Sequence, residues 1–423
     1  LNRACIPTKF LLRSVEIYQL IKDSTRYGVS VAETGIDMAE VQSRKSKMVS
    51  TLKTGLAGVI EMNGIEVVKG CARLTPEKSI EITDERGNKR NIGAEKVILA
   101  TGSRAVNLNI PGADSPEVLF ADDILNLNYV PESMIIIGGG MVGVEMATIL
   151  AKMDCRVSLI EMMPHILPNE DAEITVVLEG ALKRDGVRIY TGSVVTRIDA
   201  DDKNKKVVIS ARNVEKSLEA ESIAIAAGYE SYIDGLCLDE CSIATVDGCI
   251  RVNEYMQTSV ADIYAVGDVT GGMMLAYVAM AEGRVAAENA LGGHSKIDYQ
   301  AVPRCIFTLP EVASVGLTED EAKAQGCKVK SGRFPFAANS AANILGERRG
   351  MVKIVADEEN SKVLGVHIIG AGAVNLISEA TLAIKLGATL DDIKNTLHAH
   401  PTLSEAFWEA ALDASGETIH LKN

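Results

Sequence analysis

The chain has 423 residues, 47% of them hydrophobic and 24% charged, which is ordinary for a folded protein of roughly three domains. Its formal net charge of −14 argues against nucleic acid or an anionic membrane as a partner. Eight cysteines spread through so long a chain indicate a reducing compartment. We therefore expect a cytosolic protein in which a special cysteine is catalytic rather than structural.

The predicted elements begin with two helices, over residues 7–26 and 37–63, followed by short strand-like runs from 65–69 to 97–100. The stretch 134–151 contains three glycines and Glu145, which predicts a strand, a turn and a helix rather than a membrane span. With the strand 156–161 it forms one strand, helix, strand unit of a parallel-sheet nucleotide domain, roughly residues 112–230. After a strand at 262–266 and a helix from 275, the helical runs 372–387 and 403–413 suggest an α+β terminal domain.

The front of the chain predicts a redox helix. Cys5 stands two residues before Pro7, and a proline fits the first turn of a helix. The helix dipole favours the thiolate, and Lys9 shares the same helix face four residues on. At the far end, His400 precedes Pro401, with Glu405 one turn later. A thiolate, a cation and a histidine beside a carboxylate are the parts that dithiol chemistry needs.

The glycines Gly138, Gly140 and Gly143 directly follow an apolar strand and open a helix. The first permits a tight turn, the second lets a pyrophosphate approach the backbone, and the third allows close helix packing. Glu161 ends the next strand, where a carboxylate can accept a hydrogen bond from a ribose 2′-hydroxyl. It is followed by Met162 and Met163 instead of an arginine, so the pattern favours NAD over NADP. The alternative is that the glycines make a tight turn only.

Six motifs run in order through the whole chain and carry a resemblance. They are CysIleProThrLys at 5, AlaThrGlySer at 100, the GlyGlyGly turn at 138, GlyAspVal at 267, CysIlePheThrLeuProGlu at 305 and HisAlaHisProThrLeuSerGlu at 398. Together they resemble the pyridine nucleotide-disulfide oxidoreductases, and the last motif is most similar to the members that oxidise dihydrolipoyl groups.

The resemblance implies an α/β fold with two Rossmann-like three-layer nucleotide-binding domains and a C-terminal α+β dimerisation domain. The implied boundaries are 1–111 for an FAD domain truncated at its N-terminus, 112–230 for the NAD domain, 231–302 for the continuation of the FAD domain and 303–423 for the interface domain. It also implies FAD and NAD as cofactors, a homodimer, and a lipoyl-bearing protein of a 2-oxo acid dehydrogenase or glycine cleavage system as partner.

The same resemblance implies residue roles. Cys5 matches the flavin-side member of a redox disulfide, Lys9 a lysine near flavin N5, and Glu145 its carboxylate partner. His400 matches the catalytic base, donated by the second subunit and oriented by Glu405. The residues that match FAD contacts are Lys9, Thr101, Gly102, Ser103, Asp268, Met274, Leu275 and Ala276. Those that match the NAD site are Gly138, Gly139, Gly140, Gly143, Glu145, Glu161, Val195 and Gly228.

Two departures from the family pattern stand out. The first cysteine of the family's CysXaaXaaXaaXaaCys loop would fall immediately before Leu1, and the strand, glycine turn and helix that bind the FAD pyrophosphate would also lie upstream, so the chain resembles a member cut at its front. A third difference is Tyr277, which stands where the family usually has a histidine after the segment that meets the flavin edge. We expect no metal site, because Cys237 and Cys241 have no further ligands at a suitable spacing.

Simpler explanations stand beside these roles. Thr402 and Glu405 match a helix capping box, which is compatible with a catalytic part. His398 fits a surface or helix-entry histidine better than a second base, and Asp268 would also fit a turn cap. For the whole chain, the alternatives are a reductase of another low-molecular-weight disulfide, or a non-catalytic NAD-binding dimerisation module.

Overall fold

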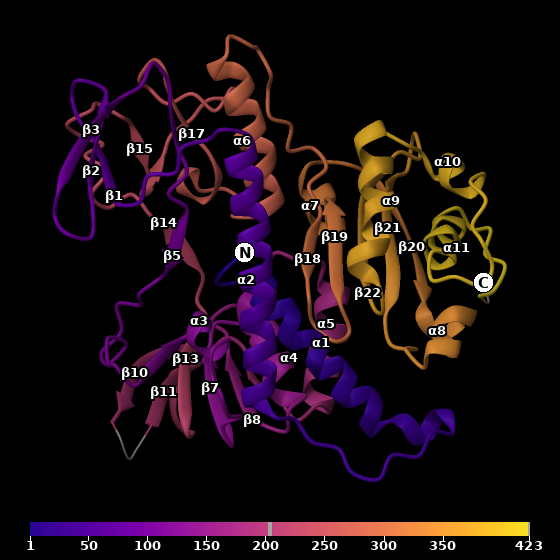
Figure 1. Ribbon diagram of the computed structural model, residues 1–423. Coiled ribbons are helices and arrows are strands. Elements are labelled where there is room, and N and C mark those ends of the chain that lie inside the picture. The colour runs from indigo at the N-terminus through magenta and orange to yellow at the C-terminus, as the bar shows by residue number, and fades with distance from the viewer. Residues whose placement is uncertain (202–204, 422–423) are drawn as a thin grey trace. The chain divides into compact units, whose positions relative to one another are not determined.

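The computed structural model describes residues 1–201 and 205–421. The chain divides into two compact units, each assembled from stretches that are distant in sequence (Figure 1). The first unit comprises Leu1–Lys53, Asn107–Ala227 and Gln300–Asn423, and the second comprises Thr54–Val106 and Gly228–Tyr299.

The two predicted N-terminal helices are present. Helix α1 spans Cys5–Lys22 and is followed by a short 3-10 helix, Ser24–Tyr27, while α2 spans Met38–Met62. Leu11, Leu12 and Val15 form the buried face of α1, at the spacing of an amphipathic helix, and pack in an apolar cluster with α4. This packing fixes the helix against α4, and Cys5, the first residue of the helix, remains exposed to solvent.

The centre of the first unit is a five-stranded parallel sheet in the order β6-β13-β7-β8-β9. Its central strand β7 is buried on both faces, which explains the unbroken apolar run MetIleIleIle. A three-stranded antiparallel sheet, β10-β11-β12, belongs to the same region. The bounds are β6 Val118–Phe120, α3 Ala121–Ile124, β7 Ser133–Ile137, α4 Met141–Ala151, β8 Arg156–Ile160, α5 Ala172–Arg184, β9 Arg188–Tyr190, β10 Val194–Ala200, β11 Lys205–Ala211, β12 Val214–Glu219 and β13 Ser222–Ile225.

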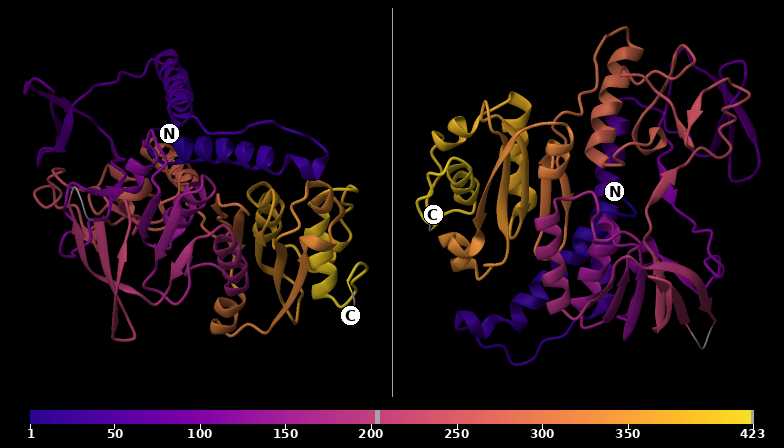
Figure 2. Two further views of the ribbon diagram at one scale, coloured as in Figure 1. Left: turned by 90° about the horizontal axis from the view of Figure 1, so that it is seen from below. Right: turned by 180° about the vertical axis from the view of Figure 1, so that it is seen from behind.

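The C-terminal part of the first unit contains an antiparallel sheet in the order β18-β19-β22-β21-β20, together with helices α7 to α11. It is drawn in orange to yellow in Figure 2. Because side chains alternate along a strand, Val352 and Ile354 of β21 face the apolar cluster formed with α9 and α11, whereas Lys353 between them bonds to Asp171, the N-cap residue of α5. The bounds are β18 Arg304–Ile306, β19 Val312–Gly316, α7 Glu319–Ala324, β20 Val329–Pro335, α8 Ser340–Leu345, β21 Met351–Asp357, β22 Val363–Ile369, α9 Ala373–Leu386, α10 Leu390–Lys394 and α11 Glu405–Ala414.

The second unit contains short sheets, helix α6 and the C-terminal end of α2. Strands β4 and β17 pair in parallel, and β5 pairs with β14 in the antiparallel sense. The bounds are β1 Cys71–Leu74, β2 Ser79–Thr83, β3 Lys89–Gly93, β4 Val97–Leu99, β5 Ser103–Ala105, β14 Tyr229–Ser231, β15 Thr245–Val246, β16 Cys249–Ile250, β17 Ile263–Ala265 and α6 Ala276–Ala290. The strand predicted over 65–69 is wrong, because this exposed apolar segment pairs with no strand among the described residues.

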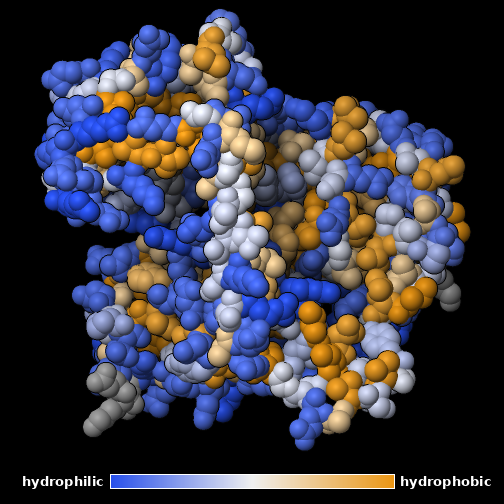
Figure 3. Space-filling model, viewed as in Figure 1, coloured by the Kyte–Doolittle hydropathy of each residue, from blue (hydrophilic) through white to orange (hydrophobic). Residues whose placement is uncertain are grey.

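Large apolar side chains are exposed on the C-terminal part of the first unit (Figure 3). The most exposed of them are Ile344, Leu382, Leu386, Leu397 and Ile419. Among residues 1–201 and 205–421, none of the helices combines the length and the apolar character that crossing a bilayer requires.

Candidate active site

The N-terminus of α1 presents Cys5 as the first helical residue, exposed to solvent. The N-cap is Ala4, whose side chain offers no hydrogen bond, and the first turn contains no acidic residue. The positive end of the helix dipole therefore acts on the sulfur without a competing carboxylate in that turn. In contrast, burial raises the pKa of Cys155 to about 12 and that of Cys305 to about 11, which makes both thiols unreactive near neutral pH.

Lys9 and Glu145, which are 136 residues apart, form an ion pair in the first unit. The Lys9 ammonium donates to both carboxylate oxygens of Glu145 at 3.2 Å and lies 4.2 Å from the centre of the Phe307 ring. The backbone N–H of Phe307 donates to Oε1 of Glu145 at 2.8 Å. Burial raises the pKa of Glu145, and the Lys9 charge and the Phe307 hydrogen bond oppose that rise. The pair therefore fixes one ammonium on the same helix as Cys5.

The glycine turn after β7 has the close packing that its sequence predicts. Gly138 has φ +114°, and a Cβ there would lie 2.5 Å from the carbonyl oxygen of Ala226. A Cβ on Gly143 would lie 1.8 Å from the carbonyl oxygen of Gly138. A Cβ on Gly140 would meet no atom within 4 Å, so this position faces open space at the N-terminus of α4. The first and third glycines are thus required by the fold, and the second leaves room for a ligand.

Glu161 lies beside this turn and is nearly buried. Its Oε2 accepts from the backbone N–H of Gly139 and its Oε1 accepts from that of Met163, both at 2.7 Å. A carboxylate has about four lone-pair sites, so further acceptor capacity remains for a hydroxyl donor. The side chain of Val195 packs in the apolar cluster beneath the parallel sheet, and Gly228, at φ +109°, belongs to the second unit.

The second unit brings together two of the predicted flavin segments. Ser103 donates to Oδ2 of Asp268 at 2.6 Å, and Thr101 donates to the carbonyl oxygen of Tyr232 at 2.6 Å. Gly102, between them, has φ +76°, a conformation that glycine adopts without strain. Asp268 lies in the short 3-10 helix Gly267–Thr270 and so keeps a fixed position.

The predicted segment Met274 to Ala276 forms the start of α6. Met274 has φ +49°, Leu275 is the N-cap residue without a side-chain hydrogen bond, and Ala276 begins the helix. Leu275 thus provides no side-chain cap for the first turn of α6.

His400 and Glu405 form a hydrogen-bonded pair at the start of α11. Nδ1 of His400 lies 2.8 Å from Oε1 of Glu405, and the backbone N–H of Thr402 donates to Oε2 at 2.8 Å. Burial raises the pKa of Glu405, but the hydrogen bonds from Thr402 and His400 outweigh it, so the pKa lies below its ordinary value. Glu405 therefore makes one half of the expected capping interaction and orients the imidazole as well.

His398, two residues earlier, has a separate partner. Its Nε2 lies 3.0 Å from Oε1 of Glu379 on α9, and its Nδ1 lies 3.0 Å from the carbonyl oxygen of Thr396. Both ring nitrogens are occupied and the side chain is almost buried. These two contacts support a structural role for His398 rather than a second base, although the side chain is not on the surface, which was one of the two expected placements.

Sequence reasoning missed two features. The first is the hydrogen bond from the backbone N–H of Phe307 to Glu145. Almost every residue has a backbone N–H, so the residue type at position 307 does not predict this bond. The pairing of Glu409 with His420 was also missed, although His420 is one of only six histidines. Within the described residues, no group of three His, Cys, Asp or Glu is placed to hold a metal ion.

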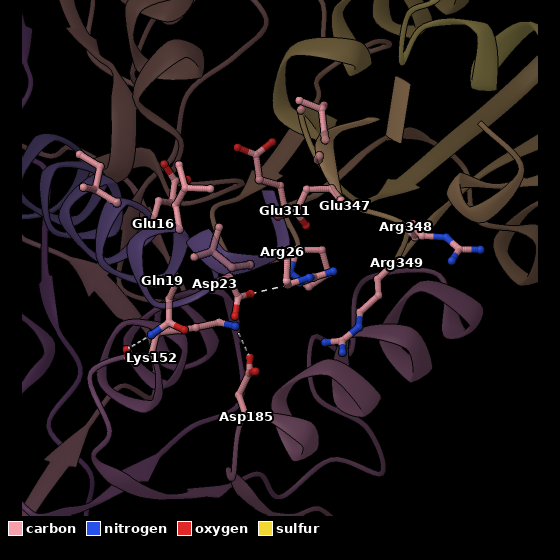
Figure 4. A pocket seen from close by; sticks show the side chains of 18 of the residues that line it. Glu16, Gln19, Asp23, Arg26, Lys152, Asp185, Glu311, Glu347, Arg348 and Arg349 are labelled. Atoms are coloured by element: carbon pink, nitrogen blue, oxygen red, sulfur yellow. Dashed lines mark hydrogen bonds and ion pairs between the residues drawn. The ribbon is translucent and has the colours of Figure 1, made fainter. Parts of the chain in front are cut away.

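A cavity of about 800 Å³ in the first unit lies beside the second half of α1 (Figure 4). It contains none of the predicted site residues. Two of its cations are already paired, Lys152 with Asp185 at 2.9 Å and Arg26 with Asp23 at 3.1 Å. The predicted machinery therefore lies elsewhere.

Comparison with known proteins decides the family. Residues 1–283 match the pyridine nucleotide-disulphide oxidoreductase family, and residues 302–411 match its dimerisation domain. The chain belongs to this family. Its matched dimerisation domain supports a homodimer.

Relatives within the family are similar along nearly the whole chain. A dihydrolipoyl dehydrogenase of Bacillus subtilis is 40% identical over 99% of this chain and 91% of its own length. The mitochondrial dihydrolipoyl dehydrogenase of Pisum sativum is 35% identical over all of this chain and 85% of its own. Among solved structures, LpdA of Mycobacterium tuberculosis is 25% identical with a TM-score of 0.88, covering 97% of this chain and 90% of that one. The HOCl-induced flavoprotein disulfide reductase RclA of Escherichia coli is 25% identical with a TM-score of 0.86, covering 97% and 89%.

Family members use FAD and NAD(H), and these are the cofactors of this chain. The residues fit both groups. The open space at Gly140, the uncapped start of α4 and the free acceptor capacity of Glu161 suit a dinucleotide. The Ser103 and Asp268 pair and the uncapped start of α6 suit a polar cofactor chain.

Proposed function

We propose that this chain oxidises dihydrolipoyl groups to lipoyl groups and reduces NAD+, acting as a homodimeric flavoprotein. The observation that carries the proposal is the hydrogen bond between His400 and Glu405 in the segment that distinguishes dihydrolipoyl oxidation within the family. Relatives named dihydrolipoyl dehydrogenase, up to 40% identical over almost the full chain, support it.

His400 is the proposed base. Its Nδ1 faces Glu405, which holds the tautomer and orientation of the ring and leaves Nε2 as the proton acceptor. A dihydrolipoyl group loses two protons and two electrons when it becomes a disulfide. Only the thiolate attacks a disulfide sulfur efficiently, so removal of the first proton starts the reaction. In the proposed dimer the second subunit donates this histidine.

Cys5 is the proposed flavin-side sulfur, and it is exposed at the first residue of α1, where the positive end of the helix dipole lies. Lys9 supplies a fixed positive charge on the same helix, held by Glu145 and by the Phe307 ring. FAD, when bound, passes the two electrons from the sulfur side to NAD+.

The proposed NAD site is the turn Gly138–Gly143 with Glu161. The Glu161 carboxylate favours a ribose hydroxyl and repels a 2′-phosphate, and its neighbours Met162 and Met163 provide no cation to offset that repulsion. We propose NAD rather than NADP on this ground. A turnover assay with each nucleotide tests it, and a preference for NADP would contradict it.

The proposed partner is the lipoyl-bearing protein of a 2-oxo acid dehydrogenase or glycine cleavage system. The proposed dimer buries the apolar side chains exposed on the C-terminal region, among them Leu382 and Leu386. We also propose a cytosolic setting, which the eight free cysteines of the described chain support.

The purified protein tests the main proposal directly. We expect visible flavin absorbance bands and NADH formation from dihydrolipoamide and NAD+. A colourless protein that binds NADH without turnover would instead support the non-catalytic dimerisation module.

A second candidate is a reductase of another low-molecular-weight disulfide. The likeness of the fold to the flavoprotein disulfide reductase RclA, with a TM-score of 0.86, favours it. Rates with lipoamide and with glutathione disulfide, measured at equal NADH, separate the two candidates. A higher kcat/KM for glutathione disulfide would replace the first proposal with the second.

A further inference from the structure

Glu282 is a buried acid on the inner face of α6, in the second unit. Val278, Val285 and Ala286, which lie about one turn away on this helix, are also buried. Glu282 itself is 4% exposed. A buried carboxylate destabilises a fold unless donors replace the lost water, and a leucine would pack here without that cost. Core packing alone therefore does not explain the acid.

Both carboxylate oxygens of Glu282 accept hydrogen bonds. Oε2 accepts from the backbone N–H of Gly267 at 2.6 Å, and Oε1 accepts from the hydroxyl of Tyr299 at 2.6 Å. Burial and the bond to Glu282 raise the pKa of Tyr299, so its hydroxyl stays protonated and remains a donor. The two donors fix the orientation of the carboxylate, and bonds to a charged acceptor are stronger than bonds between neutral groups.

Helix α6 contacts Gly267 at a second point. Ala279 precedes Glu282 by three residues, so both side chains lie on the same side of the helix. A Cβ on Gly267 would lie 3.0 Å from the Cβ of Ala279, and Gly267 has φ +71°, which glycine adopts without strain. Gly267 therefore packs directly against α6, within reach of the Glu282 carboxylate.

Gly267 begins the 3-10 helix Gly267–Thr270, which carries Asp268. Two serines hold Asp268 itself: Ser103 donates to its Oδ2 at 2.6 Å, and Ser231 donates to its carbonyl oxygen at 2.5 Å. Ser103 lies on β5 and Ser231 on β14, so hydrogen bonds from two strands and from α6 meet at this turn. The bond to Glu282 fixes the backbone of the residue that precedes Asp268.

We propose that Glu282 is a positioning residue for the flavin site. Through its bond to the Gly267 N–H it sets the backbone of the 3-10 helix, and thereby the direction in which the Asp268 carboxylate meets FAD. Tyr299 acts through Glu282, because it orients the carboxylate. The inference rests on the flavin contact assigned to Asp268 and so deepens the proposed function.

Two substitutions separate the length of the Glu282 side chain from its charge. Glu282→Asp keeps the charge, but its side chain is one methylene shorter and falls short of the Gly267 N–H. Glu282→Gln removes the charge and keeps the length, so its Oε1 can accept from Gly267 while its Nε2 donates to the Tyr299 oxygen.

The dissociation constant of FAD, followed by the fluorescence of flavin released from the holoprotein, tests the inference. Glu282→Asp raises this constant about tenfold and Glu282→Gln less than about twofold, because a lost hydrogen bond to a charged group is transmitted in part to the cofactor. A constant in Glu282→Asp that is no higher than in Glu282→Gln overturns the inference.

The visible circular dichroism of the bound flavin is a second readout, because it reports the geometry of the flavin site rather than the stability of the fold. Glu282→Asp alters these bands, and Glu282→Gln keeps them native. Native bands in Glu282→Asp overturn the inference.

The matched control is Asn289→Ala. Asn289 lies seven residues later on the same face of α6, is also buried, and donates to the carbonyl oxygens of Tyr255 at 3.0 Å and Ser295 at 2.8 Å. Asn289→Ala lowers the melting temperature and leaves FAD binding and the flavin bands unchanged. If it weakens FAD binding as much as Glu282→Asp, the effect is a general loss of stability and the inference is overturned.

Melting temperatures show whether Glu282→Asp is folded. If it does not fold, Tyr299→Phe provides the test, because Glu282 then keeps one donor and the FAD constant rises about two- to threefold. An unchanged constant in Tyr299→Phe overturns the inference.

Turnover separates this inference from the proposed function. A native protein that binds FAD without oxidising dihydrolipoamide refutes the proposed function, while the FAD constants of the variants still decide the role of Glu282. A native protein that binds no FAD overturns the inference itself.

Discussion

The turn 138–143 and the segment 398–405 are held in position in different ways, the first by its backbone and the second by its side chains. In the turn, the backbone carries the constraint, because a Cβ on Gly138 or Gly143 would overlap a carbonyl oxygen of the chain itself. In the segment, side chains carry it, through the bonds of His400 to Glu405 and of His398 to Glu379. The proposed nucleotide site, where a pyrophosphate must approach the backbone closely, is thus part of the fold itself. The orientation of the proposed proton acceptor depends on side-chain hydrogen bonds, which a single substitution can remove.

The largest expected effect concerns the side-chain region. His400→Gln should lower dihydrolipoamide turnover by about 10²- to 10⁴-fold, because a positioned base is lost from the reaction. The melting temperature and the flavin absorbance should stay close to native, since His400 is exposed and packs in no core. Stopped-flow and steady-state rates measure the loss. A variant with near-native turnover would refute the role of His400.

A substitution in the glycine turn 138–143 should mainly change the stability of the fold. Gly143→Ala should lower the free energy of unfolding by about 1–3 kcal/mol, because the new Cβ would lie 1.8 Å from the Gly138 oxygen and the turn must move. Urea unfolding followed by circular dichroism measures it.

Gly140→Ala is the matched control within the same turn. Its Cβ meets no atom within 4 Å and its φ of −73° suits alanine, so stability should stay native. NADH binding should nevertheless weaken by about tenfold, or about 1.4 kcal/mol, because the methyl group occupies the space that the pyrophosphate needs. Equal NADH affinity in the native protein and this variant would contradict the proposed site.

The sequence was informative where a pattern is local. The apolar run of β7 and the three glycines predicted a strand and a tight turn, and the structure has both, with close packing at Gly138 and Gly143. Lys9 and Glu145 are 136 residues apart, and only the family resemblance joined them before the structure did. The bond from the Phe307 backbone and the return of the tail to Glu409 depend on tertiary packing, which no local spacing records. The wrong strand at 65–69 has the same cause, since a strand needs a partner that its own residues do not specify.

Ion pairs also join α5 to the C-terminal sheet, through Arg333 with Glu173 and Lys353 with Asp171. The stability that such pairs contribute should fall in acid. A hydrogen bond from Arg333 lowers the pKa of Glu173 to about 2, and one from Lys323 does so for Glu319. Both lie below the ordinary value of 4.5, so the stability they contribute is complete above that pH and is lost as the pH falls toward 2. Thermal unfolding between pH 6 and pH 3 measures this loss.

Arg333→Met should flatten that acid dependence, because Glu173 loses its main partner. Arg90→Met is the control, since the pair of Arg90 with Glu66 is exposed on both sides and should contribute little. Equal slopes in the native protein and Arg333→Met would assign the acid sensitivity to other groups.

The smallest expected effect is that of replacing His398, and it distinguishes the structural role of this residue from the proposed catalytic role of His400. The hydrogen bond to Glu379 raises the pKa of His398 above its ordinary value of 6.5, so the stability it contributes is complete below pH 6.5 and is lost as the pH rises through the folded-state value. His398→Gln should therefore lower the free energy of unfolding by about 0.5–1.5 kcal/mol at pH 6 and by less at pH 9. Dihydrolipoamide turnover should change far less than in His400→Gln. A loss of turnover as large as that of His400→Gln, with native stability at pH 6, would make His398 part of the proton path.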